Sequence, residues 1–224
     1  MKTLSILTLA TISLLPTLAE ADHQQRRSHS SYRSEPAMYI FGGVSTSSFN
    51  FDRSDFRYSF GDGSLSDVTV DTESGGARFG FGFDFTPELS LELGYASLGT
   101  LAGSGISDGS QFLNNGFSAG RVDMDSNADG VFLGVNVHTP INEPVGLFAR
   151  FGIYGWELDG TLEDNSRSGQ FTVEGSDPYA GIGLRLSVAR NVSVVLAYDY
   201  YVLDDDESIN ISADTLSVDM VFRF

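Results

Sequence analysis

The sequence GARFGFGFDFTPELSLELGYASLG (residues 76–99) decides the fold class, because apolar residues occupy every second position in both of its halves. The apolar positions are Ala77, Phe79, Phe81, Phe83, Phe85, Leu89, Leu91, Leu93 and Tyr95. Alternation with a period of two, interrupted by a Thr-Pro-Glu turn, is typical of a β-hairpin with one apolar face. The stretch therefore predicts two antiparallel strands.

Two classes of protein contain such hairpins. In a soluble β-sandwich the apolar face packs against a second sheet, whereas in an outer-membrane barrel it faces lipid and the polar face lines the lumen. The hairpin is compatible with both classes, so the remaining sequence has to discriminate between them.

The amino terminus predicts export. Lys2, an apolar run over residues 4–18 and the small-x-small sequence Ala19-Glu20-Ala21 are typical of a signal peptide, assigned to residues 1–21. The run is broken by polar residues and a proline, and it is short for a membrane-spanning helix. Residues 22–36 are polar and predict a flexible extension, which leaves residues 37–224 as one domain.

Composition restricts the partners of the exported chain. Without cysteine, the fold has to be stable without disulfides. Removal of residues 1–21 leaves 12 arginines, no lysine and 29 acidic residues, a net charge of −17. Such a charge disfavours nucleic acid and anionic membrane surfaces as partners.

The rest of the chain favours the membrane class. Six more alternating segments predict strands at residues 38–45, 130–138, 145–158, 179–188, 192–200 and 216–224. Long polar segments, predicted as loops at residues 46–75, 100–126, 159–174 and 204–211, alternate with short turns. This alternation, the even strand count and the terminal Phe224 predict an all-β, eight-stranded antiparallel up-and-down transmembrane β-barrel.

Glycines on the polar parity of these strands fit a narrow lumen that side chains fill. They are Gly80, Gly82, Gly94, Gly134, Gly152, Gly181 and Gly183.

The segments LELGYASLG, LFARFGIYGWEL, YAGIGLRLS, LAYDYY and VDMVFRF resemble, in order and spacing, the transmembrane domain of OmpA-like outer-membrane proteins. The resemblance implies a Gram-negative outer-membrane location, short periplasmic turns, long surface loops and a mid-lumen ion-pair network. Glu92 and Arg150 occupy matching positions, whereas Arg185, Asn136 and Val195 depart from the pattern. Because the chain stops at the last predicted strand, we expect no separate peptidoglycan-binding domain.

The predicted lumen contains equal numbers of opposite charges. By parity they are Arg78, Arg150, Arg185, Arg223, Asp84, Glu92, Asp199 and Asp219. A balanced buried set predicts a self-neutralising network, whereas an ion-selective pore would show an excess of one sign. From their distance to the turns, we expect Glu92 to pair with Arg150, Arg185 or both, with Asp219 completing the set. Arg78 and Asp199 are assigned to the same network.

The function predicted from these features is a structural or surface-interaction role, with a largely closed lumen and without enzyme activity. A small gated ion channel or porin is the first alternative, and an outer-membrane lipid-modifying enzyme is the second. His138 lies beside a turn, and the sequence shows no serine–acid pair near it. No catalytic residue, cofactor or metal site is assigned.

One segment of the chain is only partly similar to a calcium-binding loop. The sequence DSNADG (residues 125–130) matches the first half of a calcium loop. The twelfth position, where a bidentate glutamate belongs, is Asn136 inside a predicted strand.

The predicted loops contain 17 acidic residues and four arginines. They form either a solvated, non-adhesive surface or a surface that gathers a cationic partner or divalent cations shared with lipopolysaccharide phosphates. The expected partners are outer-membrane lipid, lipopolysaccharide, the barrel-assembly machinery and an unidentified extracellular ligand. The protein is expected to be a monomer, with Phe222 and Phe224 as its C-terminal assembly signal.

Overall fold

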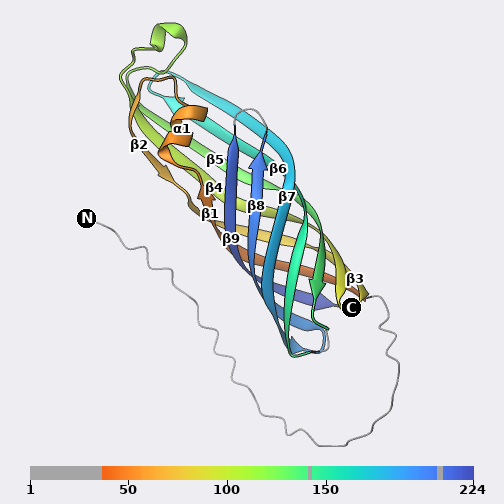
Figure 1. Ribbon diagram of the computed structural model, residues 1–224. Helices are drawn as coiled ribbons and strands as arrows, with labels where there is room; N and C mark the ends of the chain where they lie inside the picture. Colours follow the sequence, from red (N-terminus) through yellow and green to blue (C-terminus); the bar gives the residue numbers. More distant parts are fainter. Residues whose placement is uncertain (1–36, 141–142, 206–208) are drawn as a thin grey trace, which may run out of the picture. The chain divides into compact units, whose positions relative to one another are not determined.

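The computed structural model describes residues 37–140, 143–205 and 209–224 (Figure 1). The predicted signal peptide and the extension at residues 22–36 lie outside the described residues. The strands are β1 (Ala37–Asn50), β2 (Leu65–Asp71), β3 (Glu73–Thr86), β4 (Leu89–Ser107), β5 (Gly120–His138), β6 (Val145–Asp164), β7 (Ser168–Ala189), β8 (Val192–Asp204) and β9 (Asn210–Arg223). Helix α1 spans Arg53–Ser59, and a short 3-10 helix, η1, spans Phe112–Asn114. No helix within the described ranges is both long enough and apolar enough to cross a bilayer.

Eight strands close into an antiparallel barrel, as the sequence predicts. The order around the ring is β1, β3, β4, β5, β6, β7, β8 and β9, and pairing of β9 with β1 closes it. Strand β2 stands outside this ring and pairs with the part of β4 that extends beyond β3. We call the end with the β3–β4, β5–β6 and β7–β8 connections the turn end, and the opposite end the loop end (Figure 1).

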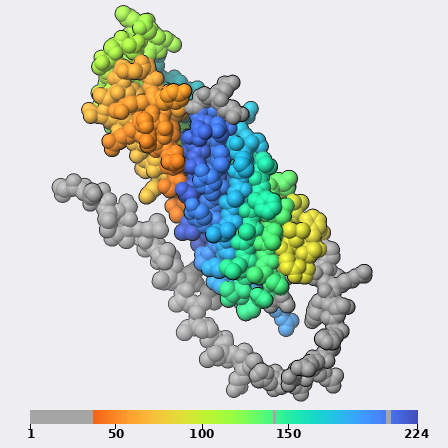
Figure 2. Space-filling model, in the orientation of Figure 1, coloured from red at the N-terminus to blue at the C-terminus, as the bar shows by residue number. Residues whose placement is uncertain are grey.

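The turn-end half of the barrel has an apolar outer surface. Phe81 and Ile182 are more than 60% exposed, as expected for side chains that face lipid rather than a second sheet. Figure 2 shows one face of the molecule, with the orange α1 region at the loop end and the blue strands β8 and β9 below it. The predicted apolar parity therefore points outward.

The prediction of loops is wrong for much of the long polar segments, because the strands continue into them. Strand β6 has 20 residues and β7 has 22, whereas a membrane crossing needs about 9 to 11. Toward the loop end the period of two persists, but the polarity reverses: in β6 the outward residues become Glu157 and Asp159, and the inward residues become Trp156 and Leu158. These strand ends are built like a soluble barrel around its own core.

A β-bulge in β4 marks this change. The pairing with β5 shifts between Ser97 and Gly99, and Gly99 has a φ of +94°, which glycine adopts without steric cost. The bulge moves the inward positions of β4 from even to odd numbers, so that both Leu98 and Leu101 are buried. One strand thereby supplies apolar side chains to the interior on both sides of the bulge.

Helix α1 adds an aromatic side chain to this core at the loop end. Its first turn is stabilised by a capping box, in which Asp52 accepts hydrogen bonds from the N–H groups of Ser54 and Asp55, while Asp55 accepts from the N–H of Asp52. Phe56 is fully buried, and its ring lies on the backbone of Gly103 in β4.

Candidate functional site

Inward glycines and aromatic rings from neighbouring strands shape the lumen. A Cβ atom added at Gly82 would lie 1.9 Å from Cζ of the Tyr39 ring, and one at Gly80 would lie 2.6 Å from the ring of Phe41. All seven polar-parity glycines have such close inward neighbours, so the predicted narrow lumen is present. Filled by these rings, it leaves defined spaces for the charged side chains.

Asp199 and Arg150 form the central ion pair of the lumen. Arg150 Nε donates to Asp199 Oδ1 at 2.6 Å, and Arg150 Nη2 donates to Asp199 Oδ2, which makes the pair bidentate. Asp199 is 0% exposed and Arg150 is 3% exposed. Arg78 Nη1 also approaches Asp199 Oδ2, at 3.4 Å.

Glu92 joins this pair from the side. Its Oε2 lies 3.8 Å from Arg150 Nη1, so the predicted Glu92–Arg150 pairing is present, and 4.0 Å from Arg78 Nη2. The hydrogen bonds of its Oε1 come from the Tyr39 hydroxyl at 2.8 Å and the Asn136 amide at 3.1 Å. Glu92 is thus held mainly by neutral donors.

Arg78 connects the remaining members. Its Nε lies 3.7 Å from Asp219 Oδ2, which places Asp219 in the network through Arg78. Its guanidinium carbon lies 5.1 Å from the ring centre of Phe41 and 5.0 Å from that of Phe132, distances suited to cation–π attraction. Three acids, Glu92, Asp199 and Asp219, therefore meet around two arginines, Arg78 and Arg150. These are five of the six predicted network residues.

Arg185 lies outside this network, contrary to the prediction. Its Nη2 donates to the carbonyl oxygens of Thr139 and Pro140 at 3.2 and 3.1 Å, and its Nη1 lies 3.5 Å from His138 Nδ1. Residue counts from the turns placed Arg185 at the depth of Glu92. They did not include the connection after β5, whose carbonyl groups meet the guanidinium first.

Arg185 belongs instead to a second polar cluster at the turn end. Asp84 accepts from Ser90 Oγ at 2.6 Å and from Arg223 Nε at 3.1 Å, and Ser90 Oγ lies 2.8 Å from His138 Nε2. The expectation that no serine–acid pair lies near His138 is therefore wrong. The strand register contains the missing signal, because Asp84 is paired with Ser90 and Val137 with Leu89.

This cluster differs from a nucleophilic triad. The carboxylate contacts the serine, while His138 Nδ1 contacts the carbonyl oxygen of Thr139 at 3.0 Å. In a triad the acid orients the imidazole through that nitrogen. Ser90, His138 and Asp84 are also all buried.

A small cavity of about 30 Å³ lies between the two clusters, and its lining includes Glu92, Asn136, His138 and Arg185. That volume holds about two water molecules. Buried polar atoms without a hydrogen-bond partner belong to residues of this lining, among them Glu92 Oε2, Asn136 Oδ1 and Asp219 Oδ1. The lumen is therefore polar at this depth.

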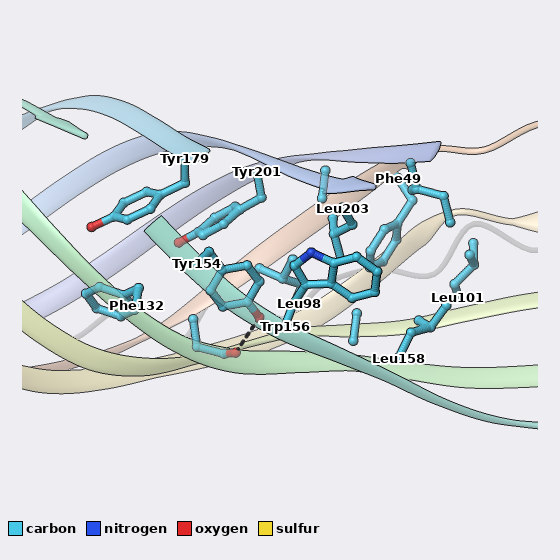
Figure 3. Packing of buried hydrophobic residues seen from close by; sticks show 14 of the residues in the cluster. Phe49, Leu98, Leu101, Phe132, Tyr154, Trp156, Leu158, Tyr179, Tyr201 and Leu203 are labelled. Atoms are coloured by element: carbon cyan, nitrogen blue, oxygen red, sulfur yellow. Dashed lines mark hydrogen bonds between the residues drawn. The ribbon is translucent and has the colours of Figure 1, made fainter. Parts of the chain in front are cut away.

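Toward the loop end the polar lumen gives way to an apolar layer, the lumen plug, drawn in Figure 3. Its labelled members are Phe49, Leu98, Leu101, Phe132, Tyr154, Trp156, Leu158, Tyr179, Tyr201 and Leu203. Tyr179 and Tyr201 stack with ring centres 5.4 Å apart, and the Tyr154 hydroxyl donates to the carbonyl of Ala96 at 2.9 Å. All ten side chains are at most 4% exposed.

The structure also places the C-terminal phenylalanines and the calcium-like motif. Phe224 is 79% exposed, and its N–H donates to the carbonyl of Met38 at 2.9 Å; Phe222 faces outward from β9. Residues 125–130, the calcium-like motif, lie in strand β5. Among the described residues no cluster of three or more His, Asp or Glu side chains is arranged to hold a metal ion.

Residues 7–224 match the family model of the outer membrane protein beta-barrel domain. Comparison with curated protein sequences finds no match.

Solved structures with a similar fold include Ail, the attachment invasion locus protein of Yersinia pestis. It is 18% identical, with a TM-score of 0.52 over 85% of this chain and 99% of Ail. Neisserial surface protein A is 9% identical, with a TM-score of 0.51 over 84% of this chain and 97% of that protein. OprG of Pseudomonas aeruginosa is 14% identical, with a TM-score of 0.51 over 84% of this chain and 95% of OprG.

At these identities the similarity to solved structures shows the fold alone. The family match covers nearly the whole chain, including every strand of the closed ring. The chain therefore belongs to the outer membrane protein β-barrel domain family.

Proposed function

We propose that this outer-membrane barrel has a structural or surface-interaction role at the cell surface and that its lumen is closed to ions. The lumen plug is the observation that carries the proposal. It places buried apolar side chains across the interior between the polar network and the loop end. An ion crossing this layer would lose its hydration without gaining polar partners.

The channel alternative is tested in planar bilayers. Protein refolded in detergent and verified by heat-modifiable gel mobility should insert without producing stable single-channel currents. Regular current steps that depend on the protein would contradict the closed lumen and favour a gated channel.

The geometry of the turn-end cluster supports a non-enzymatic role. Ser90, His138 and Asp84 are buried, and Asp84 accepts from Ser90 and lies 3.8 Å from His138 Nε2, while His138 Nδ1 contacts a backbone carbonyl. Incubation of the refolded protein with phospholipid and lipopolysaccharide should leave both unmodified by mass spectrometry. Loss or transfer of an acyl chain would favour the lipid-modifying alternative.

The charge of the loop end indicates what kind of surface partner to test. Ail has been solved in complex with sucrose octasulfate, a heparin analogue and polyanion. In this chain residues 46–75, 100–126, 159–174 and 204–211 together contain 17 acidic residues and four arginines, which favours cations and disfavours such a ligand. Cells that carry the protein should bind a cationic peptide more strongly than cells that lack it, and should not gain heparin binding.

A further inference from the structure

A pocket of about 510 Å³ opens at the loop end, outside the polar network and the lumen plug. Its walls come from the β6–β7 hairpin, from the segment after η1 and from the end of α1. The apolar lining includes Phe60, Phe117, Leu162, Phe171 and Val173. This volume lies in the range of small-molecule sites, which are about 300 to 1,000 Å³ and mostly apolar with a few polar groups.

Hydrogen bonds across the pocket wall fix its shape. Arg167 Nη1 donates to Asn115 Oδ1 at 2.9 Å, and its Nη2 donates to the carbonyl of Gly116. Asp164 Oδ2 accepts from the N–H of Ser118 at 3.0 Å. These contacts tie the β4–β5 connection to the β6–β7 hairpin, so the pocket is preformed.

Aromatic rings supply much of the apolar surface. The ring centres of Phe60 and Phe171 are 5.1 Å apart, with planes inclined at 45°. Phe117 completes the aromatic part of the lining. Aromatic faces attract cations as well as apolar groups.

The charges around the pocket also favour a cationic ligand. Among the described residues of the lining, Arg167 is the one cation, and its guanidinium donates to Asn115 Oδ1 and to the carbonyl of Gly116. Two carboxylates bind the adjoining backbone: Asp164, and Asp62, whose Oδ2 accepts from the N–H of Phe117 at 2.7 Å. The surrounding loops add further negative charge, which raises the local concentration of cations and lowers that of anions.

We propose that this pocket binds a small organic cation with an apolar body. The aromatic and aliphatic lining contacts the body, and the acidic loop end attracts the charged group. The inference deepens the proposed surface role and rests on it, because the pocket is useful only if the loop end faces the outside of the cell.

The test uses the full chain in phospholipid nanodiscs, with empty nanodiscs as the blank, and isothermal titration calorimetry. Three probes share one apolar body, the 4-phenylbutyl group: 4-phenylbutyl-trimethylammonium, 4-phenylbutanol and 5-phenylpentanoate. We expect saturable binding of the cation at one site per barrel, at least about tenfold tighter than that of the anion, and weakening as salt is raised. Equal affinity for all three probes, or tighter binding of the anion, would overturn the assignment.

A pocket-filling variant tests the location. A Cβ atom at Gly169, which lines the pocket, would meet only the carbonyl of Leu162, at 4.0 Å, so Gly169→Trp places a large side chain at the pocket wall without a clash at its Cβ. Gly75→Trp is the matched control, because its Cβ would meet only the carbonyl of Ser45 at 4.0 Å and it does not line the pocket. Gly169→Trp should weaken cation binding at least about tenfold, while Gly75→Trp should not.

Unchanged affinity in a folded Gly169→Trp protein would place the binding elsewhere and overturn the proposal. If that variant does not fold, the probe series on the unaltered chain still decides. Conductance in planar bilayers is measured separately, so failure of the pocket and failure of the closed-lumen proposal give different results.

Discussion

At the residue scale, the stability of the lumen depends on how each buried charge is shared. Asp199 is fully buried, and both of its carboxylate oxygens contact Arg150. Glu92 keeps longer ion-pair distances and receives its hydrogen bonds from Tyr39 and Asn136. These two acids therefore contribute differently, although both belong to the same network.

Asp199→Asn should destabilise the barrel by about 3 to 5 kcal/mol, because it leaves the buried Arg150 without its main counter-charge. Glu92→Gln should cost less, about 1 to 3 kcal/mol, since a glutamine oxygen can still accept from Tyr39 and Asn136. Urea unfolding in lipid vesicles, followed by fluorescence of the single tryptophan, Trp156, measures both. A larger loss for Glu92→Gln would show that the centre of the network has been misassigned.

The glycines that accept aromatic rings are a second residue-scale feature. Gly82→Ala should cost about 1 to 3 kcal/mol, because the added methyl group occupies the position of the Tyr39 ring and forces that ring to move. Gly42→Ala is the control: its Cβ would meet its nearest neighbour, the carbonyl of Arg78, at an ordinary 3.6 Å. The same unfolding measurement applies, and equal effects would argue against a packing role for Gly82.

At the element scale, the strands combine two environments. The turn-end half of β6 places Phe151 and Ile153 outward, whereas the loop-end half places Glu157 and Asp159 outward. The period of two is the same in both halves, but the apolar parity is exchanged. A strand can therefore leave the lipid and continue in water, provided that its inward side chains find a core.

The contact between the β6–β7 hairpin and the β4–β5 connection predicts a pH dependence. Desolvation opposes ionisation of Asp164, but hydrogen bonds from the N–H groups of Ser118, Ser166 and Arg167 lower its pKa from 3.8 to about 2. Because the folded-state pKa is depressed, this stabilisation is fully present above pH 3.8 and is lost as the pH falls toward 2.

Cleavage of the β4–β5 connection by pepsin should therefore accelerate between pH 4 and pH 2 in the unaltered protein. Asp164→Asn should show faster cleavage already at pH 4 and a weaker dependence on pH, because its amide does not titrate. Identical pH profiles of cleavage for the two proteins would show that Asp164 does not cause the pH dependence.

At the scale of the whole molecule, closure of β9 onto β1 joins the two ends of the described chain. The N–H of Phe224 donates to the carbonyl of Met38, so the last residue helps to complete the ring. Its exposed side chain belongs to the lipid-facing surface of an outer-membrane protein. A second role as an assembly signal is a prediction that this geometry leaves open to experiment.

Phe224→Ala should reduce the amount of heat-modifiable barrel in outer-membrane fractions several-fold. Phe81→Ala is the matched control, since Phe81 is also an outward phenylalanine, 61% exposed. Both variants should lose a similar roughly 1 to 3 kcal/mol of stability in vesicles, where only lipid contact counts. Equal assembly of the two variants in cells would reduce Phe224 to a lipid-facing residue.

The sequence by itself determined the barrel, because alternation specifies strands and their faces locally. The outward parity of β3 and β4, the inner glycines and the set of buried charges all follow from a period of two. The Glu92–Arg150 pairing could be predicted for the same reason, because parity and the distance from a turn are both counted along the local sequence.

Only the tertiary structure decided which buried groups meet. Asp199 and Arg150 lie 49 positions apart in the chain, and their bidentate contact depends on the stagger between β6 and β8. Arg185 binds carbonyl groups of the β5–β6 connection instead of joining the network. The alternation of residues along a strand does not predict the path of such a connection. The loop-end extensions of the strands were not predicted, for a related reason. Their apolar residues lie on the inward parity, and an inward apolar residue can be recognised only once the ring of strands has closed around it.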